Sequence, residues 1–188
     1  MSNSSRLFEV SPSYIHHYHS PLGEITLGSD GNALTGLWFD GQKHFGSTLT
    51  SDCEQKALPV FEQTTQWLDI YFGGKEPDFT PPLSLQMSSF GKTVCEIMLT
   101  IPFGHTLTYG QIANIIAKQM EIPKMSAQAV GGAVGHNPIS LIIPCHRVVG
   151  ANHRLTGYAG GIDKKIQLLT LERANIPLPK CNFPSITP

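Results

Sequence analysis

Cysteine, histidine and glutamate side chains in the C-terminal half of this 188-residue chain could together carry out nucleophilic chemistry. Cys145 follows the apolar residues 139–143 in the run Pro144-Cys145-His146-Arg147-Val148. Cysteine reacts as the thiolate and therefore needs a base or a positive field, for which His146 is the adjacent candidate. Neighbouring side chains on extended backbone point to opposite faces, so this pair requires a local turn or a bridging water. A buried cysteine is also a common core residue, and that alternative stays open at this point.

A histidine base needs a partner that fixes its tautomer, and Glu172 is the best candidate. A helix is predicted through Ile162, Ile166 and Leu169, and Glu172 lies three residues after Leu169. A carboxylate on a partly apolar face should have a partner. The alternative is a solvated glutamate at the end of a helix.

The other thiols and the histidine cluster do not indicate a metal or a disulfide framework. The cysteines at 53, 95, 145 and 181 form no C-x-x-C pair and no zinc-type spacing with histidine. His16, His17 and His19 alternate along a predicted strand without a cysteine nearby. We expect no metal site and no cofactor.

The N-terminal half predicts a small sheet with one helix. Three short runs, 14–19, 24–28 and 33–39, are separated by turn compositions and predict an antiparallel meander. Apolar residues then recur at helical spacing from Pro59 to Tyr71, before Gly73-Gly74. The proline-rich stretch 75–82 is the predicted linker. We therefore divide the chain into a domain with linker at 1–82 and a second domain at 83–188.

The second domain is predicted to be mostly helical. One helix runs from Phe90 to Ile101, and a second begins at Thr108, where Thr108 and Gln111 form a capping box. A third begins after Ser126, a good N-cap, and contains Gly131 and Gly132. The last two predict a helix-turn-helix, although any helical hairpin would give the same spacing. The apolar residues 139–143 predict a buried strand that ends before Cys145.

Charge is distributed unevenly over the two halves. Residues 1–89 carry 4 Lys/Arg against 10 Asp/Glu, whereas residues 90–188 carry 9 against 4. Only the second half is therefore suited to a polyanion. No signal peptide or membrane span is indicated, and we expect a soluble protein in the cytoplasm or nucleus.

The run Pro144-Cys145-His146-Arg147-Val148-Val149, preceded by Gly135-His136-Asn137-Pro138 and followed by Gly157-Tyr158-Ala159-Gly160-Gly161, strongly resembles the O6-alkylguanine-DNA alkyltransferases. The resemblance covers about residues 90–175, with weaker agreement before them. It implies an α+β fold, in which a ribonuclease H-like N-terminal domain joins a helical domain with a DNA-binding helix-turn-helix. It also implies irreversible, single-turnover transfer of an alkyl group from O6-alkylguanine, and from O4-alkylthymine, to Cys145 after base flipping.

The resemblance also implies a role for individual residues. His146 would act through water as the base, Glu172 would orient it, Asn137 would hold the turn before Cys145, and Tyr109 would donate to the guanine. The residues implied in binding DNA or the extruded base are Thr108, Ser126, Gln128, Ala129, Gly131, Val148, Tyr158 and Ala159. The partner is double-stranded DNA that contains O6-alkylguanine. We expect a monomer, with cooperative binding to DNA as an open alternative.

Gln128 departs from the family pattern, because most members carry an arginine there that fills the gap left by the flipped base. Glutamine can occupy the stack but brings no charge, so we expect weaker duplex binding or slower flipping. Cys95, where the family often has tryptophan, indicates core variation.

Two other functions would fit parts of the pattern. A cysteine hydrolase or acyltransferase could use Cys145, His146 and Glu172 as a triad, and would turn over. A non-enzymatic helix-turn-helix regulator or lesion sensor would not need the thiol of Cys145.

Overall fold

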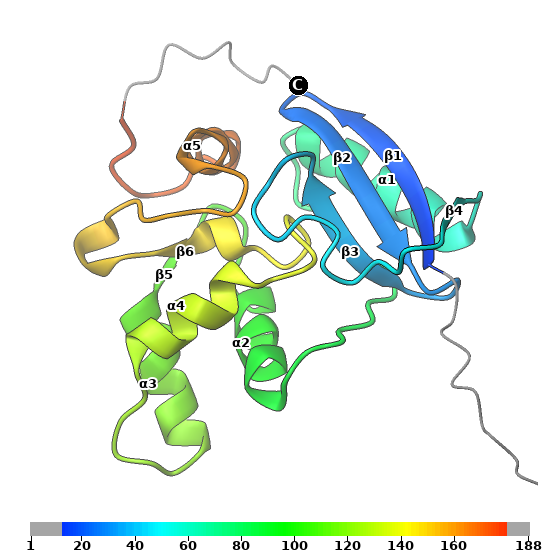
Figure 1. Cartoon of the computed structure of the whole chain (residues 1–188). Coiled ribbons are helices and arrows are strands. Elements are labelled where there is room, and N and C mark those ends of the chain that lie inside the picture. The colour runs from blue at the N-terminus through cyan, green and yellow to red at the C-terminus, as the bar shows by residue number, and fades with distance from the viewer. Residues whose placement is uncertain (1–12, 180–188) are drawn as a thin grey trace, which may run out of the picture.

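The computed structural model describes residues 13–179 and contains an antiparallel meander at its N-terminal end (Figure 1). The predicted strands are confirmed as β1 (Ser13–Ser20), β2 (Gly23–Ser29) and β3 (Leu34–Phe39). A fourth strand, β4 (Cys53–Gln55), pairs in parallel with β1 and completes the order β3-β2-β1-β4. All three residues of β4 are exposed, so no hydrophobic alternation marks this strand in the sequence.

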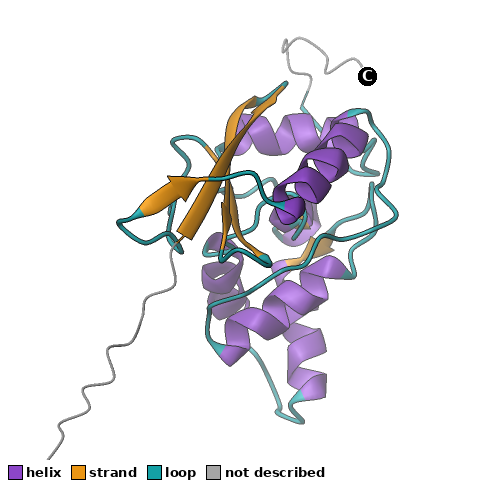
Figure 2. Cartoon of the chain, turned by 90° about the vertical axis from the view of Figure 1, so that its right-hand side faces the viewer, coloured by secondary structure: helices purple, strands orange, loops and turns teal. Residues whose placement is uncertain are grey.

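Helix α1 (Pro59–Phe72) lies against the sheet, as Figures 1 and 2 show. Pro59 occupies its first turn, where a missing N–H costs nothing, and the helix ends at Gly73 as predicted. Its apolar face is buried with the inner face of the sheet in one core. The buried residues of α1 are Val60, Phe61, Thr64, Trp67, Leu68, Tyr71 and Phe72.

Beyond the linker the chain is mainly helical, as predicted. The helices are α2 (Ser89–Leu99), α3 (Tyr109–Gln119), α4 (Ala127–Gly135) and α5 (Ile162–Leu171). The capping box of Thr108 and Gln111 is present at the start of α3, and the Ser126 side chain accepts from the amide of Ala129 at the start of α4. Helices α3 and α4 pack together and form the predicted helix-turn-helix, and α2 packs beside both of them.

Short elements connect these helices. Strands β5 (Leu107–Thr108) and β6 (Val148–Val149) pair in parallel. Two 3-10 turns, η1 (Cys145–Arg147) and η2 (Ala151–His153), lie on either side of β6.

The buried strand predicted at 139–143 is wrong. These residues are buried, but only Ile139 bridges to a strand residue, Leu37 of β3. The chain then folds into tight turns, with Leu141 at a φ of 68° and the amide of Ile143 bonded to the carbonyl of Ile139. An apolar composition predicts that a segment is buried but not which backbone conformation it adopts. Turns whose backbone N–H and C=O groups are hydrogen-bonded can be buried as completely as a strand.

The two halves share one continuous core. The chain leaving the linker bridges from Leu83 to Leu34, and buried residues of both halves belong to one hydrophobic cluster. Within residues 13–179, none of the helices has the length and hydropathy needed to cross a membrane. Cys181 and the N-terminal residues 1–6, on which the expectation of no signal peptide depends, lie outside the described residues.

Candidate active site

The Asn137 side chain holds the turn that presents Cys145. Its amide donates to the carbonyls of Ile139 and Ile143, at 3.2 and 2.9 Å, and its oxygen accepts from the amide of Ile139 at 3.0 Å. These bonds satisfy buried backbone groups that no strand partner satisfies. Cys145 follows immediately as the first residue of η1, so the chain turns at the thiol, as contact with His146 requires.

Cys145 is 5% exposed and lines a cavity of about 320 Å³. Asn137, Tyr109, Tyr158 and Ala159 line the same cavity. Burial raises the pKa of the Cys145 thiol, and the Asn137 side chain and the charge of Lys165 oppose this rise only in part. At neutral pH the resting group is therefore a thiol, and a base is needed to make it nucleophilic.

His146 is fully buried, with its Nε2 at 2.6 Å from Oε1 of Glu172. Burial lowers the pKa of His146 although Glu172 opposes the shift, so the resting imidazole is neutral. An ionised carboxylate can only accept, which places the single imidazole proton on Nε2. Nδ1 is then a free base, and it has no hydrogen-bond partner among the described residues.

Glu172 receives several donors that keep it ionised. Arg147 donates from Nε to Oε2 at 2.9 Å and from a terminal nitrogen to Oε1 at 3.1 Å, and the Tyr71 hydroxyl donates to Oε1 at 2.7 Å. The amide of Gly104 donates to Oε2 at 3.2 Å. Burial alone would raise the pKa of Glu172, but His146 and Arg147 outweigh it and lower the pKa to about 2. Glu172 is therefore a fixed negative charge beside the imidazole.

Lys165 on α5 is a positively charged group that acts on Cys145. Its side chain is fully buried, and Nζ donates to the carbonyls of Val148 and Thr156 at 2.6 and 3.3 Å. Burial lowers the pKa of Lys165 to about 8, against the opposing effect of Cys145. The carbonyl of Val148, which the family resemblance assigns to base recognition, is thus already bonded to a lysine.

The helix-turn-helix adjoins this cavity through Tyr109, the first residue of α3. Tyr109 lines both the Cys145 cavity and a second hollow of about 800 Å³ over α3 and α4, which Gln128 and Thr108 also line. Its hydroxyl accepts from Thr156 at 3.2 Å. Ser126, Gln128 and Ala129 are exposed at the start of α4.

The structure thus places Cys145 and Asn137 in the lining of one cavity, with Tyr109, Tyr158 and Ala159. His146, the residue after Cys145, is buried and paired with the buried Glu172 outside that lining. Sequence reasoning missed Arg147, Tyr71 and Lys165. Lys165 could have been found, because helical spacing places it on the apolar face of α5 with Ile166 and Leu169. The described residues hold no group of three or more His, Cys, Asp or Glu that could bind a metal ion.

Two family models match the chain. One is described as the DNA binding domain of 6-O-methylguanine DNA methyltransferase and matches residues 89–174. The other is described as the ribonuclease-like domain of the same protein and matches residues 13–85. The predicted fold class, with a ribonuclease-like domain followed by a DNA-binding helical domain, is confirmed.

Known proteins resemble the chain along most of its length. The methylated-DNA–protein-cysteine methyltransferase of Mycobacterium bovis is 41% identical over 164 residues, which are 86% of this chain and 94% of the relative. That of Methanosarcina mazei is 40% identical over 87% of this chain and 99% of the relative. The crystal structure of Mycobacterium tuberculosis OGT in complex with DNA has a TM-score of 0.73 and 39% identity, and covers 87% of this chain and 95% of its own.

Proposed function

Since the chain belongs to the 6-O-methylguanine DNA methyltransferase family, we propose that Cys145 accepts the alkyl group of O6-alkylguanine in double-stranded DNA. The observation that carries this assignment is the position of the thiol, which lines a cavity that shares Tyr109 in its wall with the hollow over the helix-turn-helix. A buried core cysteine would not line such a cavity.

The reaction begins from a neutral thiol and a neutral imidazole. The thiol proton moves to Nδ1 of His146, directly or through water, while sulfur forms a bond to the alkyl carbon. The bond between that carbon and O6 breaks, and its electron pair stays with the base. Guanine takes up one proton, which balances the thiol proton once His146 returns that proton to solvent. The products are an S-alkyl cysteine and unmodified guanine. A thioether is not readily hydrolysed, so one protein molecule repairs one lesion.

Glu172 supports the proton transfer by its fixed charge. The imidazolium that forms when His146 takes the proton lies 2.6 Å from an ionised carboxylate. Arg147 and Tyr71 hold that carboxylate in place from two sides. The charge that develops on His146 is therefore stabilised by groups already oriented before the reaction.

The glycines of α4 support an approach of DNA to this helix. A glycine inside a helix costs up to about 1 kcal/mol relative to alanine, so its presence needs a reason. A Cβ on Gly132 would meet nothing within 4 Å, and one on Gly131 would meet the Tyr109 ring only at the ordinary distance of 3.7 Å. Packing within the protein does not require either glycine. A DNA backbone lying against the middle of α4 would require them.

Base flipping follows from the depth of the thiol. An alkyl carbon on a stacked base cannot reach a cysteine that is 5% exposed, so the nucleotide must enter the cavity. Tyr109 stands between the DNA-facing hollow and the cavity, where it would donate to the guanine. O4-alkylthymine presents the same exocyclic alkoxy group and is a second proposed substrate. Gln128 would fill the gap that the flipped base leaves in the base stack, but its side chain carries no charge.

Stoichiometry tests this function. With an excess of DNA that carries labelled O6-methylguanine, we expect transfer to stop at one methyl group per protein molecule. Cys145→Ser should transfer none, whereas Cys53→Ser, which removes an exposed thiol, should transfer as much as the parent protein. Continued turnover with an ester or amide substrate would instead support a cysteine hydrolase.

A further inference from the structure

A segment of the N-terminal domain, residues 40–46, contributes Lys43 and His44 to the lining of the Cys145 cavity. We refer to it as the strap. The amide of Lys43 donates to the carbonyl of Ala159 at 3.0 Å, which joins the strap to the cavity wall. Gln42 is buried beneath it, where its side-chain oxygen accepts from the amide of Phe39 at 3.0 Å and from the Ser140 hydroxyl at 3.4 Å. The strap is therefore fixed to both halves of the protein.

Two histidines hold the outer end of the strap. The ring of His44 packs against that of His136, at the end of α4, with 4.2 Å between the ring centroids and 32° between the ring planes. The His136 ring is itself anchored, because its Nδ1 lies 2.8 Å from the carbonyl of Gly132. His44 adopts a φ of 60°, which is uncommon for a residue with a side chain. These contacts hold the strap against the end of α4 at the residue next to Lys43.

Lys43 and His44 both line the Cys145 cavity, and both are exposed. They are therefore rim residues, whereas Cys145 and Asn137 lie inside. None of the three ion pairs formed by the described residues involves Lys43. The N-terminal domain is otherwise acidic, with 4 Lys/Arg against 10 Asp/Glu in residues 1–89, yet one of its few cations stands at this rim.

The position of the rim indicates what Lys43 would meet. When a nucleotide enters a cavity with its base toward the thiol, its sugar and phosphates stay at the mouth. An exposed ammonium at that place is suited to a phosphate oxygen. We propose that Lys43 of the N-terminal domain binds a backbone phosphate of the extruded nucleotide, and that the contact between the His44 and His136 rings positions the strap for this contact. The inference rests on the proposed function.

Salt dependence of DNA binding tests this contact. Binding is measured in a Cys145→Ser background, which cannot consume the lesion, with one duplex that carries O6-methylguanine and the same duplex without it. For Lys43→Gln we expect the negative slope of log K against log salt to become shallower by about 1. Binding to the lesion duplex at 0.15 M salt should be roughly fivefold weaker. Lys43→Arg should keep the slope.

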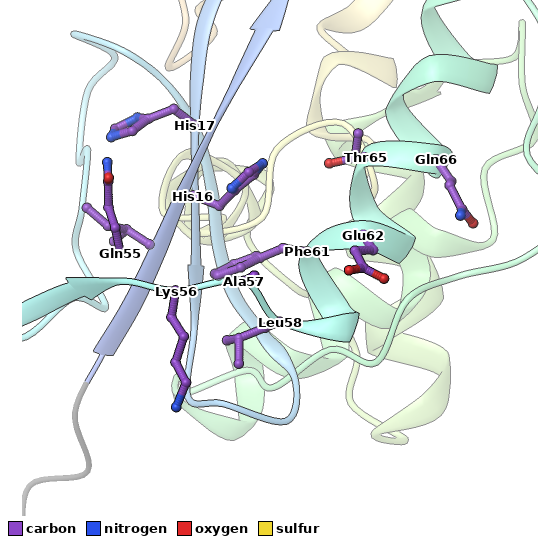
Figure 3. A pocket seen from close by; sticks show the side chains of 11 residues that line it. His16, His17, Gln55, Lys56, Ala57, Leu58, Phe61, Glu62, Thr65 and Gln66 are labelled. Carbon is purple, nitrogen blue, oxygen red and sulfur yellow. The ribbon is translucent and has the colours of Figure 1, made fainter.

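Lys56→Gln is the matched control. Lys56 is an exposed lysine of the same domain, but it lies beside a different hollow between β1, β4 and α1 (Figure 3). Its ammonium lies over the ring of Tyr14. Its replacement should change neither the slope nor the affinity. If Lys43→Gln, like Lys56→Gln, leaves the salt slope and the affinity unchanged, the proposed contact between Lys43 and a phosphate is wrong.

Reaction with the free base separates the contact from the chemistry. With Cys145 intact, O6-alkylguanine as a free base carries no phosphate, so Lys43→Gln should react with it at the parent rate. Equal losses with the free base and with DNA would also overturn the proposal, because Lys43 would then act inside the cavity. Failure of the parent protein to take up any alkyl group would instead contradict the proposed function itself.

Discussion

The hydroxyl of Tyr71 donates a hydrogen bond to Oε1 of Glu172 at 2.7 Å, across 101 positions of sequence and between the two halves of the protein. The same hydroxyl lies 3.3 Å from Nε2 of His146. Helix α1 thus reaches the carboxylate that is hydrogen-bonded to His146. The N-terminal domain therefore supplies one of the hydrogen-bond donors to the carboxylate of Glu172 in the helical domain.

Tyr71→Phe should slow alkyl transfer and leave DNA affinity unchanged. A hydrogen bond to a charged group contributes about 1.5–3 kcal/mol, and Glu172 would keep its bonds to Arg147 and His146. We therefore expect a loss of stability within that range and a several-fold slower single-turnover rate. Tyr18→Phe is the matched control, since Tyr18 donates to Asp69 at 2.8 Å on the exposed side of α1 and should leave the rate unchanged. Equal rates for the parent and Tyr71→Phe would show that this donor does not support catalysis.

Acid should destabilise the protein through Glu172. The pKa of Glu172 is lowered from 4.5 to about 2 in the folded state, so the unfolded chain binds the proton first. The resulting stability, of about 3 kcal/mol, is fully present above pH 4.5 and is lost as the pH falls toward 2. Urea unfolding between pH 5 and pH 2 should therefore show a steeper loss in the parent than in Glu172→Gln. Parallel curves for the two proteins would contradict this assignment.

Alkali should act in the opposite direction through Lys165. The pKa of Lys165 is lowered from 10.5 to about 8 by burial, so between these values the unfolded chain is protonated and the folded chain is not. Stability should then rise with pH across this range, by up to about 3 kcal/mol. Lys165→Met removes the titrating group, and its unfolding free energy should lack that rise. A similar rise in both proteins would assign it to other groups.

Gln128→Arg should strengthen binding to duplex DNA. The added cation would face the DNA from the exposed start of α4, and one further phosphate or base contact should steepen the salt slope by about 1. We also expect faster repair, because the arginine would stabilise the gap left by the flipped base. Gln128→Ala serves as the control for loss of the side chain. If Gln128→Arg changed neither affinity nor repair rate, glutamine would be an adequate replacement at this position.

Much of the fold could be predicted because local chemistry determines it. The capping box of Thr108 and Gln111 and the cap at Ser126 each place a helix start by their own hydrogen bonds. The proposed strand at 139–143 failed because its apolar residues are buried in turns, which Asn137 stabilises through its side chain. Hydrophobicity alone does not distinguish these two kinds of buried backbone.

The candidate site was predicted where its residues are close in sequence or belong to the family pattern. Cys145, His146 and Asn137 fall within nine residues of one another, and the structure places all three at one turn. Tyr71 could not be predicted, because its contact with Glu172 depends on how the two halves pack. Arg147 is part of the sequence signature, but its role as a bidentate partner of Glu172 is visible only in three dimensions.

Mapping the alkyl adduct by peptide mass spectrometry tests the central claim most directly. After incubation with DNA containing O6-methylguanine, the peptide that contains Cys145 should gain one methyl group, and those that contain Cys53 and Cys95 should not. Cys95 is an informative internal comparison, because it is also buried, and burial raises its pKa to about 12. A methyl group found on Cys95 or Cys53, or on no cysteine at all, would contradict the assignment of Cys145 as the acceptor.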